Sequence, residues 1–502
     1  MEPTLVRESV ASQAPGSVGA SDAKLLAHLF SSEECEALTR RAEGEGFAVT
    51  AHDYPPDYRN NDRRVFDDPA LAQWLFTRVR AKLPPFIAGR RGPLALLGLN
   101  PRFRACRYRD GQSFTVHQDG AYAPSARARS QLTLQISLSE PEAFSGGRTR
   151  FYEARGGRLI GAALPSRGSA LLFPHDAWHD GEPVTHGTKV VLRTDVLYEA
   201  DDDGDALAPG VLGGHRGYVF DALPLPDGIV VTAGRDKLVR VFAANGDAAA
   251  SDATFACRAA IAGHTASVTC LGLAGGRLFS GSRDRTVRAV DVARGISEVV
   301  RTVSGTVLGI SATPDGEWVA ALATGELESE HGPRVKAHDG WAWSVAVLED
   351  GTRVSVGEDG ALVWTRERGG VLTRRDLGRA ARALAVLGDG RVVVGFADGS
   401  LAWLAATPTE DPSDRWIHAH AHAVTRLAVL DRGGRGESLA IASASEDGFV
   451  RLWDIDGRPL GESQRAGIVR SVRALGSARR GEVLVAEDDG YARVLQLRVP
   501  AT

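Results

Sequence analysis

The spacing of apolar residues near the N-terminus predicts two short helices. Ser31 and Glu34 have the spacing of a capping box, which predicts a helix running to about residue 42. A second start follows at Asp68, which precedes a proline, and the apolar residues then recur at helical spacing until the proline pair at 84–85. We therefore expect both helices to present one apolar face to a core.

The pattern changes at about residue 100, where short runs of β-branched and aromatic residues are separated by glycine or proline. Six runs predict strands: FRACRYRD (103–110), SFTVHQD (113–119), QLTLQISL (131–138), TRFYEA (149–154), SALLF (169–173) and KVVLRTDVLY (189–198). Helices followed by antiparallel-looking strands favour an α+β domain with a double-sheet, jelly-roll core over residues 23–200. Residues 1–22 are polar and predict a disordered tail.

Beyond residue 200 the chain first becomes acidic and then repeats. Residues 201–212 combine acidic side chains with glycine and proline, which predicts a linker. Over residues 213–500, four histidines are each followed after 20 to 27 residues by an aspartate in a tight turn: His215 with Asp236, His264 with Asp284, His338 with Asp359 and His420 with Asp447. Two further units keep only the aspartate, at Asp398 and Asp489, and a degenerate unit fits residues 311–325.

The repeat has the period and sequence of a known module. The 253 residues from Asp236 to Asp489 span six intervals of about 42 residues, within the ~40–45 of a WD repeat. The segments SRDRTVRAVDV (282–292) and EDGFVRLWDI (446–455) resemble that family directly. The resemblance implies a seven-bladed β-propeller whose closed ring leaves no exposed sheet edge. It also implies that the repeated histidines and aspartates form hydrogen bonds within each blade, a structural role.

Composition and charge narrow the classes of function. Apolar residues make up 43% of the chain, enough for real cores, and the net charge of −4 indicates neither a nucleic-acid partner nor an anionic membrane. Four cysteines without a CxxC pair argue against a disulfide framework and against a thiolate metal site. No apolar run reaches the ~18 residues of a membrane span, and no signal-peptide core is present, so we expect a cytoplasmic protein. No feature of the sequence sets the oligomeric state.

A candidate metal site begins with His117-Gln118-Asp119 in a predicted strand. Side chains at positions i and i+2 of a strand point to one face, so one imidazole and one carboxylate can meet a single ion. A third ligand must come from elsewhere, and the candidates are His175, His179 and His186. Two histidines and one carboxylate are typical of non-haem Fe(II) oxygenases.

Three longer segments support this interpretation: NPRFRACRYRDGQSFTVHQDG (100–120), SGGRTRF (145–151) and GSALLFPHDAWHDGEPVTHGTKVVLRTDVLY (168–198). Over about residues 23–198 the sequence resembles the catalytic domain of prolyl 4-hydroxylases and related 2-oxoglutarate oxygenases. The resemblance implies that His117, Asp119 and His179 are the iron ligands, because His179 opens the family's distal HDGEPV motif. His175 and His186 are then expected to orient loops or to lie at the surface.

The resemblance also implies residues for the cosubstrate. The far carboxylate of 2-oxoglutarate needs a cation inside the pocket, and Lys189 stands ten residues after His179, where the family places a basic residue. Arg193 is the alternative or a helper, unless it forms an ion pair with a nearby carboxylate. Tyr108 resembles the tyrosine that hydrogen-bonds the same carboxylate, and Thr149 is expected to line the pocket. Ordinary core packing for the tyrosine and strand propensity for the threonine are the competing interpretations.

The implied function is a dioxygenase with a docking module. The family uses Fe(II), 2-oxoglutarate and O₂, with ascorbate as reductant, and hydroxylates a C–H bond while releasing succinate and CO₂. The favoured substrate is a prolyl residue in a protein or peptide, recruited by the propeller. A small-molecule hydroxylase and a non-catalytic WD-repeat scaffold with a vestigial oxygenase domain are the alternatives. In the polar loop 54–64, substrate contacts by Arg59, Asn60 and Asp62 and a simple solvated turn remain equally open.

Overall fold

The computed structural model describes residues 23–497 with several gaps, and the chain divides into two compact units between Asp202 and Asp203. The gaps are residues 45, 50–58, 90–91, 121, 123, 125–127, 154–156, 200–207, 249–252, 314, 367–368, 406–410, 432–437, 466 and 476–480. The tail predicted over residues 1–22 and most of the predicted linker therefore lie outside the described residues.

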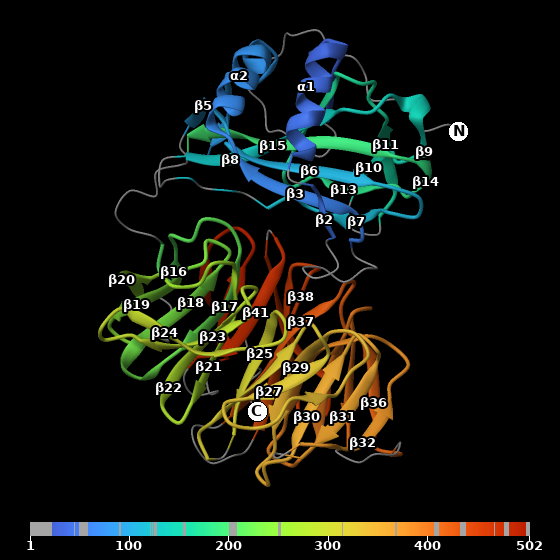
Figure 1. Cartoon of the computed structure of the whole chain (residues 1–502). Helices are drawn as coiled ribbons and strands as arrows, with labels where there is room; N and C mark the ends of the chain where they lie inside the picture. The colour runs from blue at the N-terminus through green and yellow to red at the C-terminus, as the bar shows by residue number, and fades with distance from the viewer. Residues whose placement is uncertain are drawn as a thin grey trace. The chain divides into compact units, whose positions relative to one another are not determined.

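Two facing sheets form the first unit (Figure 1). In spatial order the main sheet contains β1 (Lys24–Leu26), β12 (Ala170–Pro174), β8 (Ala128–Ser137), β15 (Lys189–Glu199), β6 (Arg102–Tyr108), β3 (Asp62–Asp67) and β2 (Ala48–Val49), with β5 (Gly92–Leu99) on β15 and β4 (Phe86–Gly89) on β5. The smaller sheet contains β11 (Leu159–Ala163), β10 (Thr149–Tyr152), β13 (Trp178–Gly181) and β7 (Phe114–His117). A two-stranded sheet adds β14 (Val184–Gly187) and β9 (Phe144–Gly146). All six strands predicted from the sequence are confirmed.

Both predicted helices are confirmed, together with their start signals. Helix α1 (Ser32–Glu43) begins at the Ser31 capping box, in which the Ser31 hydroxyl accepts from the Glu34 N–H and the Glu34 carboxylate accepts from the Ser31 N–H. Helix α2 (Pro69–Val79) is capped by the Asp68 carboxylate. The helices lie on one side of the main sheet (Figure 1) and bury an apolar face against it. Short 3₁₀ turns occupy Arg80–Lys82, Pro141–Ala143 and Pro226–Gly228.

Within its described residues, the second unit contains seven four-stranded antiparallel sheets. In chain order they are β17 (Val219–Pro224), β18 (Ile229–Gly234), β19 (Val239–Asn245), β20 (Thr254–Ile261); β21 (Val268–Ala274), β22 (Arg277–Ser282), β23 (Thr286–Asp291), β24 (Ile296–Thr302); β25 (Val307–Ala312), β26 (Trp318–Leu322), β27 (Glu326–Ser329), β28 (Val335–Lys336); β29 (Ala342–Val347), β30 (Arg353–Gly357), β31 (Ala361–Thr365), β32 (Val371–Asp376); β33 (Ala381–Val386), β34 (Val392–Phe396), β35 (Ser400–Leu404), β36 (Arg415–His418); β37 (Val424–Asp431), β38 (Ser438–Ser445), β39 (Phe449–Asp454), β40 (Pro459–Gln464); and β16 (Val211–Leu212), β43 (Ala492–Gln496), β42 (Glu482–Glu487), β41 (Val469–Ala474).

The sheets follow one another as a ring. Each strand of the series β17, β21, β25, β29, β33, β37 and β41, one from each sheet, packs against the next, and β41 packs against β17. The ring closes through β16, whose two residues pair with Arg493 and Ala492 of β43. Val211 and Leu212, which the composition assigned to the linker, therefore belong to the last sheet, because the chain's final three strands need a fourth from the start of the unit.

Hydrogen bonds between the repeated histidines and aspartates stabilise four of the sheets, as predicted. Each histidine Nδ1 lies 2.8 to 3.1 Å from its aspartate, and each Nε2 contacts a serine or threonine hydroxyl of the second strand. Near the ring axis, the buried Asp221 carboxylate accepts from Arg426 on β37 and Arg473 on β41. These contacts make the repeat chemistry structural.

The architecture confirms the predicted fold class, mostly β with an α+β jelly-roll domain followed by a WD-repeat propeller. None of the described helices combines the length and apolar character needed to cross a bilayer.

Candidate metal centre and cavity

Two histidines face each other across neighbouring strands of the smaller sheet. Strands β7 and β13 run antiparallel with His117 opposite His179, and their ring centroids are 4.3 Å apart. The His117 Nδ1 lies 2.7 Å from the Thr115 carbonyl oxygen, and the His179 Nδ1 lies 2.9 Å from that of Ala177. Because a carbonyl only accepts, each Nδ1 carries the proton, and each Nε2 keeps its lone pair for a metal ion.

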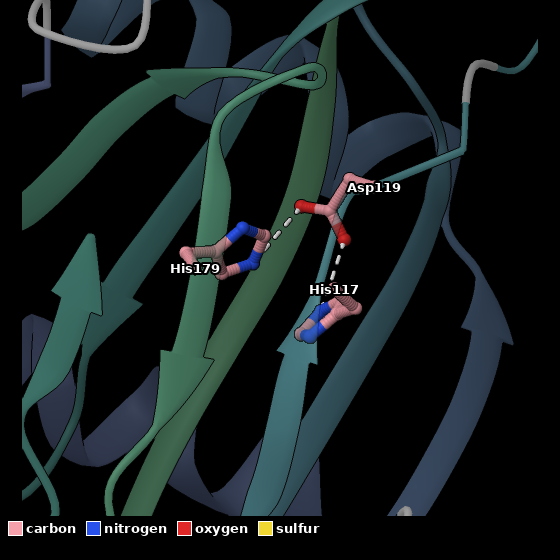
Figure 2. A group of neighbouring side chains, drawn as sticks. All are labelled: His117, Asp119 and His179. Atoms are coloured by element: carbon pink, nitrogen blue, oxygen red, sulfur yellow. Dashed lines mark ion pairs between the residues drawn. The ribbon is translucent and has the colours of Figure 1, made fainter. Parts of the chain in front are cut away.

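Asp119 completes the group from outside the strand. Strand β7 ends at His117, so the expectation that both residues share one strand face is wrong. The Asp119 N–H instead donates to the His175 carbonyl oxygen at 2.9 Å, which turns the chain over the end of the sheet. The carboxylate then lies 3.8 Å from the His117 Nε2 and 3.7 Å from the His179 Nε2 (Figure 2).

The three side chains fit a metal ion. Both Nε2 atoms are buried and have no hydrogen-bond partner among the described residues, which is unusual for buried polar atoms. One possible ligand atom from each of His117, Asp119 and His179 lies within 4.8 Å of the other two, so the three side chains form a group that could hold one ion. Burial holds the pKa of both histidines below its usual value. Burial alone would raise the pKa of Asp119, but the neighbouring Arg193 cation keeps it well below its usual range, so the ligand set is two neutral imidazoles and one carboxylate.

The other two candidate histidines lie elsewhere. His175 is buried, its ring lies 3.8 Å from Asp195, and its carbonyl receives the Asp119 N–H, so it orients the loop that carries Asp119. His186 is exposed on β14. Of the three candidates for the third ligand, the structure brings only His179 together with the other two.

A small cavity opens beside the two imidazoles. Its lining contains Tyr108, Phe114, His117, Gln135, Thr149, His179, Asp180, Gly181, Lys189, Val191 and Arg193. The four residues predicted to hold the cosubstrate therefore lie around one small cavity, together with two of the three candidate ligands.

Lys189 is a buried cation in this lining. Its ammonium donates to the Gly147 carbonyl oxygen at 2.5 Å and lies 5.7 Å from the ring centroid of Tyr108, its partner on β6. No carboxylate of the described residues lies within salt-bridge distance of the ammonium. Burial lowers the pKa of Lys189 to about 8. A buried ammonium without a carboxylate partner is suited to receive an anion.

Arg193, four residues further along β15, differs from Lys189 because it is already paired. Its guanidinium forms an ion pair with the Asp119 carboxylate, the competing interpretation that the sequence left open. Thr149 accepts a hydrogen bond from the Gln135 amide at 3.0 Å. Burial raises the pKa of Tyr108 to about 12, so its phenol keeps its proton and can donate.

The three residues considered for substrate contact do not line the cavity. The Arg59 guanidinium stacks over the Phe114 ring at 4.2 Å, and the side-chain amide oxygen of Asn60 accepts from the Ser113 N–H at 2.7 Å. The Asp62 carboxylate accepts from Arg107 at 2.8 Å. These contacts attach the segment to β6 and β7, although Arg59 lies directly behind a ring that does line the cavity.

Sequence reasoning missed the polar residues that β8 contributes. Gln135 lines the cavity, and the Thr133 hydroxyl donates to the Asp119 carboxylate at 2.6 Å. The signal was present, because Gln131, Thr133 and Gln135 alternate with apolar residues and so predict one polar strand face. Phe114, Asp180 and Val191 carried no comparable signal.

Two neutral imidazoles and one carboxylate converging inside a jelly-roll barrel define the class of mononuclear non-haem iron oxygenase sites. A family model described as the 2OG-Fe(II) oxygenase superfamily matches residues 103–194, and a model of the WD domain, G-beta repeat, matches residues 255–291 and 414–454. The chain is 32% identical over 162 residues to a PKHD-type hydroxylase from Parvibaculum lavamentivorans, a match that covers 31% of this chain and 67% of that protein. The chain therefore belongs to the 2OG-Fe(II) oxygenase superfamily, as a dioxygenase domain followed by WD repeats.

Further relatives agree over the same domain. A PKHD-type hydroxylase from Bordetella pertussis is 27% identical over 172 residues, covering 33% of this chain and 74% of the relative. One from Shewanella baltica is 32% identical over 136 residues, and this match covers 26% of this chain and only 57% of the relative.

The crystal structure of the WD40 beta propeller domain of Doa1 aligns with a TM-score of 0.48 at 18% identity, over 58% of this chain and 96% of that one.

Proposed function

We propose that His117, Asp119 and His179 hold Fe(II) and that the adjoining cavity takes 2-oxoglutarate. One observation carries this proposal. Two buried imidazole nitrogens and one carboxylate face each other beside a cavity lined by a buried lysine, and within the described part of the chain the two nitrogens have no hydrogen-bond partner and the lysine has no carboxylate partner. The metal group and the anion-binding group are thus present together.

Each residue of the cavity has a distinct task in this proposal. The Lys189 ammonium neutralises the far carboxylate of 2-oxoglutarate, and the Tyr108 phenol donates a hydrogen bond to the same group. Thr149, fixed by the Gln135 amide, sets the width of the pocket between them. The apolar walls of Phe114 and Val191 exclude water and strengthen these interactions.

When bound, iron with 2-oxoglutarate and O₂ supplies an oxidant that hydroxylates a C–H bond and releases succinate and CO₂. The protein keeps both ligand imidazoles neutral through burial, and each Nδ1–H donates a hydrogen bond to the carbonyl oxygen of Thr115 or Ala177. These two hydrogen bonds fix the tautomer and the direction of each Nε2. Ascorbate is the proposed reductant that maintains Fe(II).

For the substrate, we favour a prolyl residue in a protein or peptide, since the sequence resembles the prolyl-hydroxylase catalytic domain over its whole jelly roll. The relatives are named only as PKHD-type hydroxylases. The propeller is the proposed docking module, because a closed ring of sheets offers a rigid face to a partner protein. The cytoplasmic location stays a prediction.

Succinate release from 2-oxoglutarate with Fe(II) and ascorbate tests the metal ligands. Wild type should turn over 2-oxoglutarate, and His117→Ala and Asp119→Ala should reduce the rate to background. His186→Ala is the matched control, because it removes an exposed histidine of the same domain and should leave the rate unchanged. Retained turnover in both ligand variants would exclude His117 and Asp119 from the centre.

Substrate class needs a second assay. Proline-containing peptides incubated with the full chain should gain one oxygen atom, detected by mass spectrometry, and the gain should disappear with His179→Ala. Turnover that occurs without any peptide gain, but is stimulated by a small molecule that is hydroxylated, would favour the small-molecule enzyme. Background succinate release in wild type would favour the non-catalytic scaffold.

A further inference from the structure

The two oxygens of the Asp119 carboxylate have different surroundings. The Oδ2 atom accepts from the Thr133 hydroxyl at 2.6 Å and from the Arg193 guanidinium. The Oδ1 atom, 3.8 Å from the His117 Nε2, receives no hydrogen bond from the described residues. One oxygen is therefore occupied by two donors, and the other remains available to an ion.

Arg193 also changes the charge balance of the cavity. Asp119 is the one acidic residue among the candidate ligands, and the Arg193 guanidinium forms an ion pair with its carboxylate. Lys189 adds a further positive charge in the same lining, and the Asp180 carboxylate is already bound by Arg150 at 2.9 and 2.6 Å. With Asp119 and Asp180 each paired to an arginine, the Lys189 ammonium leaves this lining with a net positive charge, even though the proposed function requires it to bind a metal cation.

We propose that Arg193 is a positioning residue that makes metal binding and 2-oxoglutarate binding depend on each other. Its guanidinium holds Asp119 by one oxygen and repels a divalent ion that arrives alone. This repulsion is offset when a dianion enters the same cavity. The inference rests on the proposed function and adds a specific role for Arg193 in it.

The physical reason is that like charges interact strongly in a buried site, where the effective dielectric constant is far below that of water. A fixed guanidinium one hydrogen bond away from a metal ligand therefore weakens the metal-only complex more than the complex that also contains two carboxylates. Coupling between two ligands is reciprocal, so the same factor must appear in the affinity of the anion measured with and without metal. Chelation by the anion adds to the coupling, but it does not depend on residue 193.

Mn(II) is a suitable probe, because it remains divalent in air and its binding is followed by electron paramagnetic resonance. The dissociation constant of Mn(II) is measured on the full chain with and without saturating 2-oxoglutarate, and their ratio is the coupling factor. In Arg193→Gln we expect Mn(II) alone to bind at least about tenfold more tightly, or about 1.4 kcal/mol, and the coupling factor to fall by a similar amount.

Two matched variants separate charge from packing. Arg193→Lys keeps the positive charge and should keep the wild-type coupling factor. Thr133→Val removes the other donor to the same oxygen without changing charge, and its coupling factor should stay within about threefold of wild type, well below the tenfold effect of removing a charge. If Arg193→Gln does not fold, Arg193→Met is the second uncharged variant, since its apolar chain suits the buried position.

Unchanged or weaker binding of Mn(II) alone in the uncharged variant, with a wild-type coupling factor, would overturn the inference. An equal loss of coupling in Thr133→Val would also overturn it, since a charge effect would then be excluded. Failure of the wild type to bind Mn(II) even with 2-oxoglutarate would instead refute the metal assignment, and with it the proposed function. The two failures are therefore distinguishable.

Discussion

Replacing Lys189 by methionine tests the anion-binding half of the site. Methionine keeps an unbranched chain of similar length, so the change removes the ammonium and its hydrogen bond to the Gly147 carbonyl and leaves the packing against Tyr108 largely intact. The candidate metal ligands are untouched, because Lys189 contacts none of them in the described structure. The substitution therefore isolates the interaction with the far carboxylate of 2-oxoglutarate.

The magnitude follows from the burial of Lys189. A charge-assisted hydrogen bond contributes about 1.5–3 kcal/mol, and loss of that amount raises the KM for 2-oxoglutarate by about one to two orders of magnitude. The loss acts on binding in the ground state and the transition state alike, so kcat at saturation should change much less than KM. Lys189→Arg keeps the cation and should recover most of the affinity.

Initial rates of succinate release over a range of 2-oxoglutarate concentrations measure both constants. Lys336→Met is a matched control: the Lys336 ammonium also donates to a backbone carbonyl, that of Thr324 at 2.7 Å, but it is exposed and lies in the propeller. Its KM should equal that of wild type. A wild-type KM in Lys189→Met would refute the assignment of Lys189. If the KM for 2-oxoglutarate rises strongly in Arg193→Gln but stays at the wild-type value in Lys189→Met, Arg193 and not Lys189 binds the far carboxylate.

Three further predictions follow from the same structure. Burial lowers the pKa of Lys189 to about 8, so the ammonium loses its proton as the pH rises through that value. The affinity of the metal-free protein for 2-oxoglutarate, measured by calorimetry, should therefore weaken above pH 8. Lys189→Arg should show no such decline. Mn(II) with 2-oxoglutarate at about 100 times Kd should stabilise the oxygenase domain by about 2.7 kcal/mol. In thermal unfolding, the melting temperature of that domain should rise while that of the propeller stays constant, and equal shifts in both transitions would contradict a specific site. Asp221→Asn removes a buried carboxylate that pairs with two half-buried arginines and should destabilise the propeller by about 3 kcal/mol in urea. Asp454→Asn, which breaks an exposed pair with Arg458, should cost less than about 1 kcal/mol, and similar losses in the two variants would refute the role of burial.

The propeller was the part of the fold most readily predicted, because its signal is local and repeated. Each His–Asp pair lies within a single sheet, so spacing along the chain reports a real contact. The closing strand β16 was missed, since its pairing with β43 joins residues that are far apart in sequence and its two residues follow an acidic stretch. Contacts of that kind leave no local pattern.

The candidate site was predictable only in part for the same reason. The residue types and the strand alternation indicated His117, and the resemblance added His179 and Lys189, all of which lie beside the cavity. The contact between Arg193 and Asp119 depends on the register of β15 against its neighbours, which no single segment encodes. For Arg59 and Asp62 the sequence suggested a substrate contact, but both side chains attach their segment to the barrel. A polar loop in a sequence gives no means of distinguishing these two roles.

The energetics of the cavity residues favour a ligand-binding domain over a vestigial one. Two buried imidazole nitrogens without partners among the described residues would cost about 1–3 kcal/mol each if no ligand bound them, and lowering the pKa of Lys189 from 10.5 to about 8 corresponds to about 3 kcal/mol. Together these penalties are comparable with the ~5–15 kcal/mol net stability of a typical domain. A metal ion at the two imidazoles and an anion at Lys189 would remove both penalties at once, so His117, His179 and Lys189 are the side chains through which these ligands are expected to stabilise the domain.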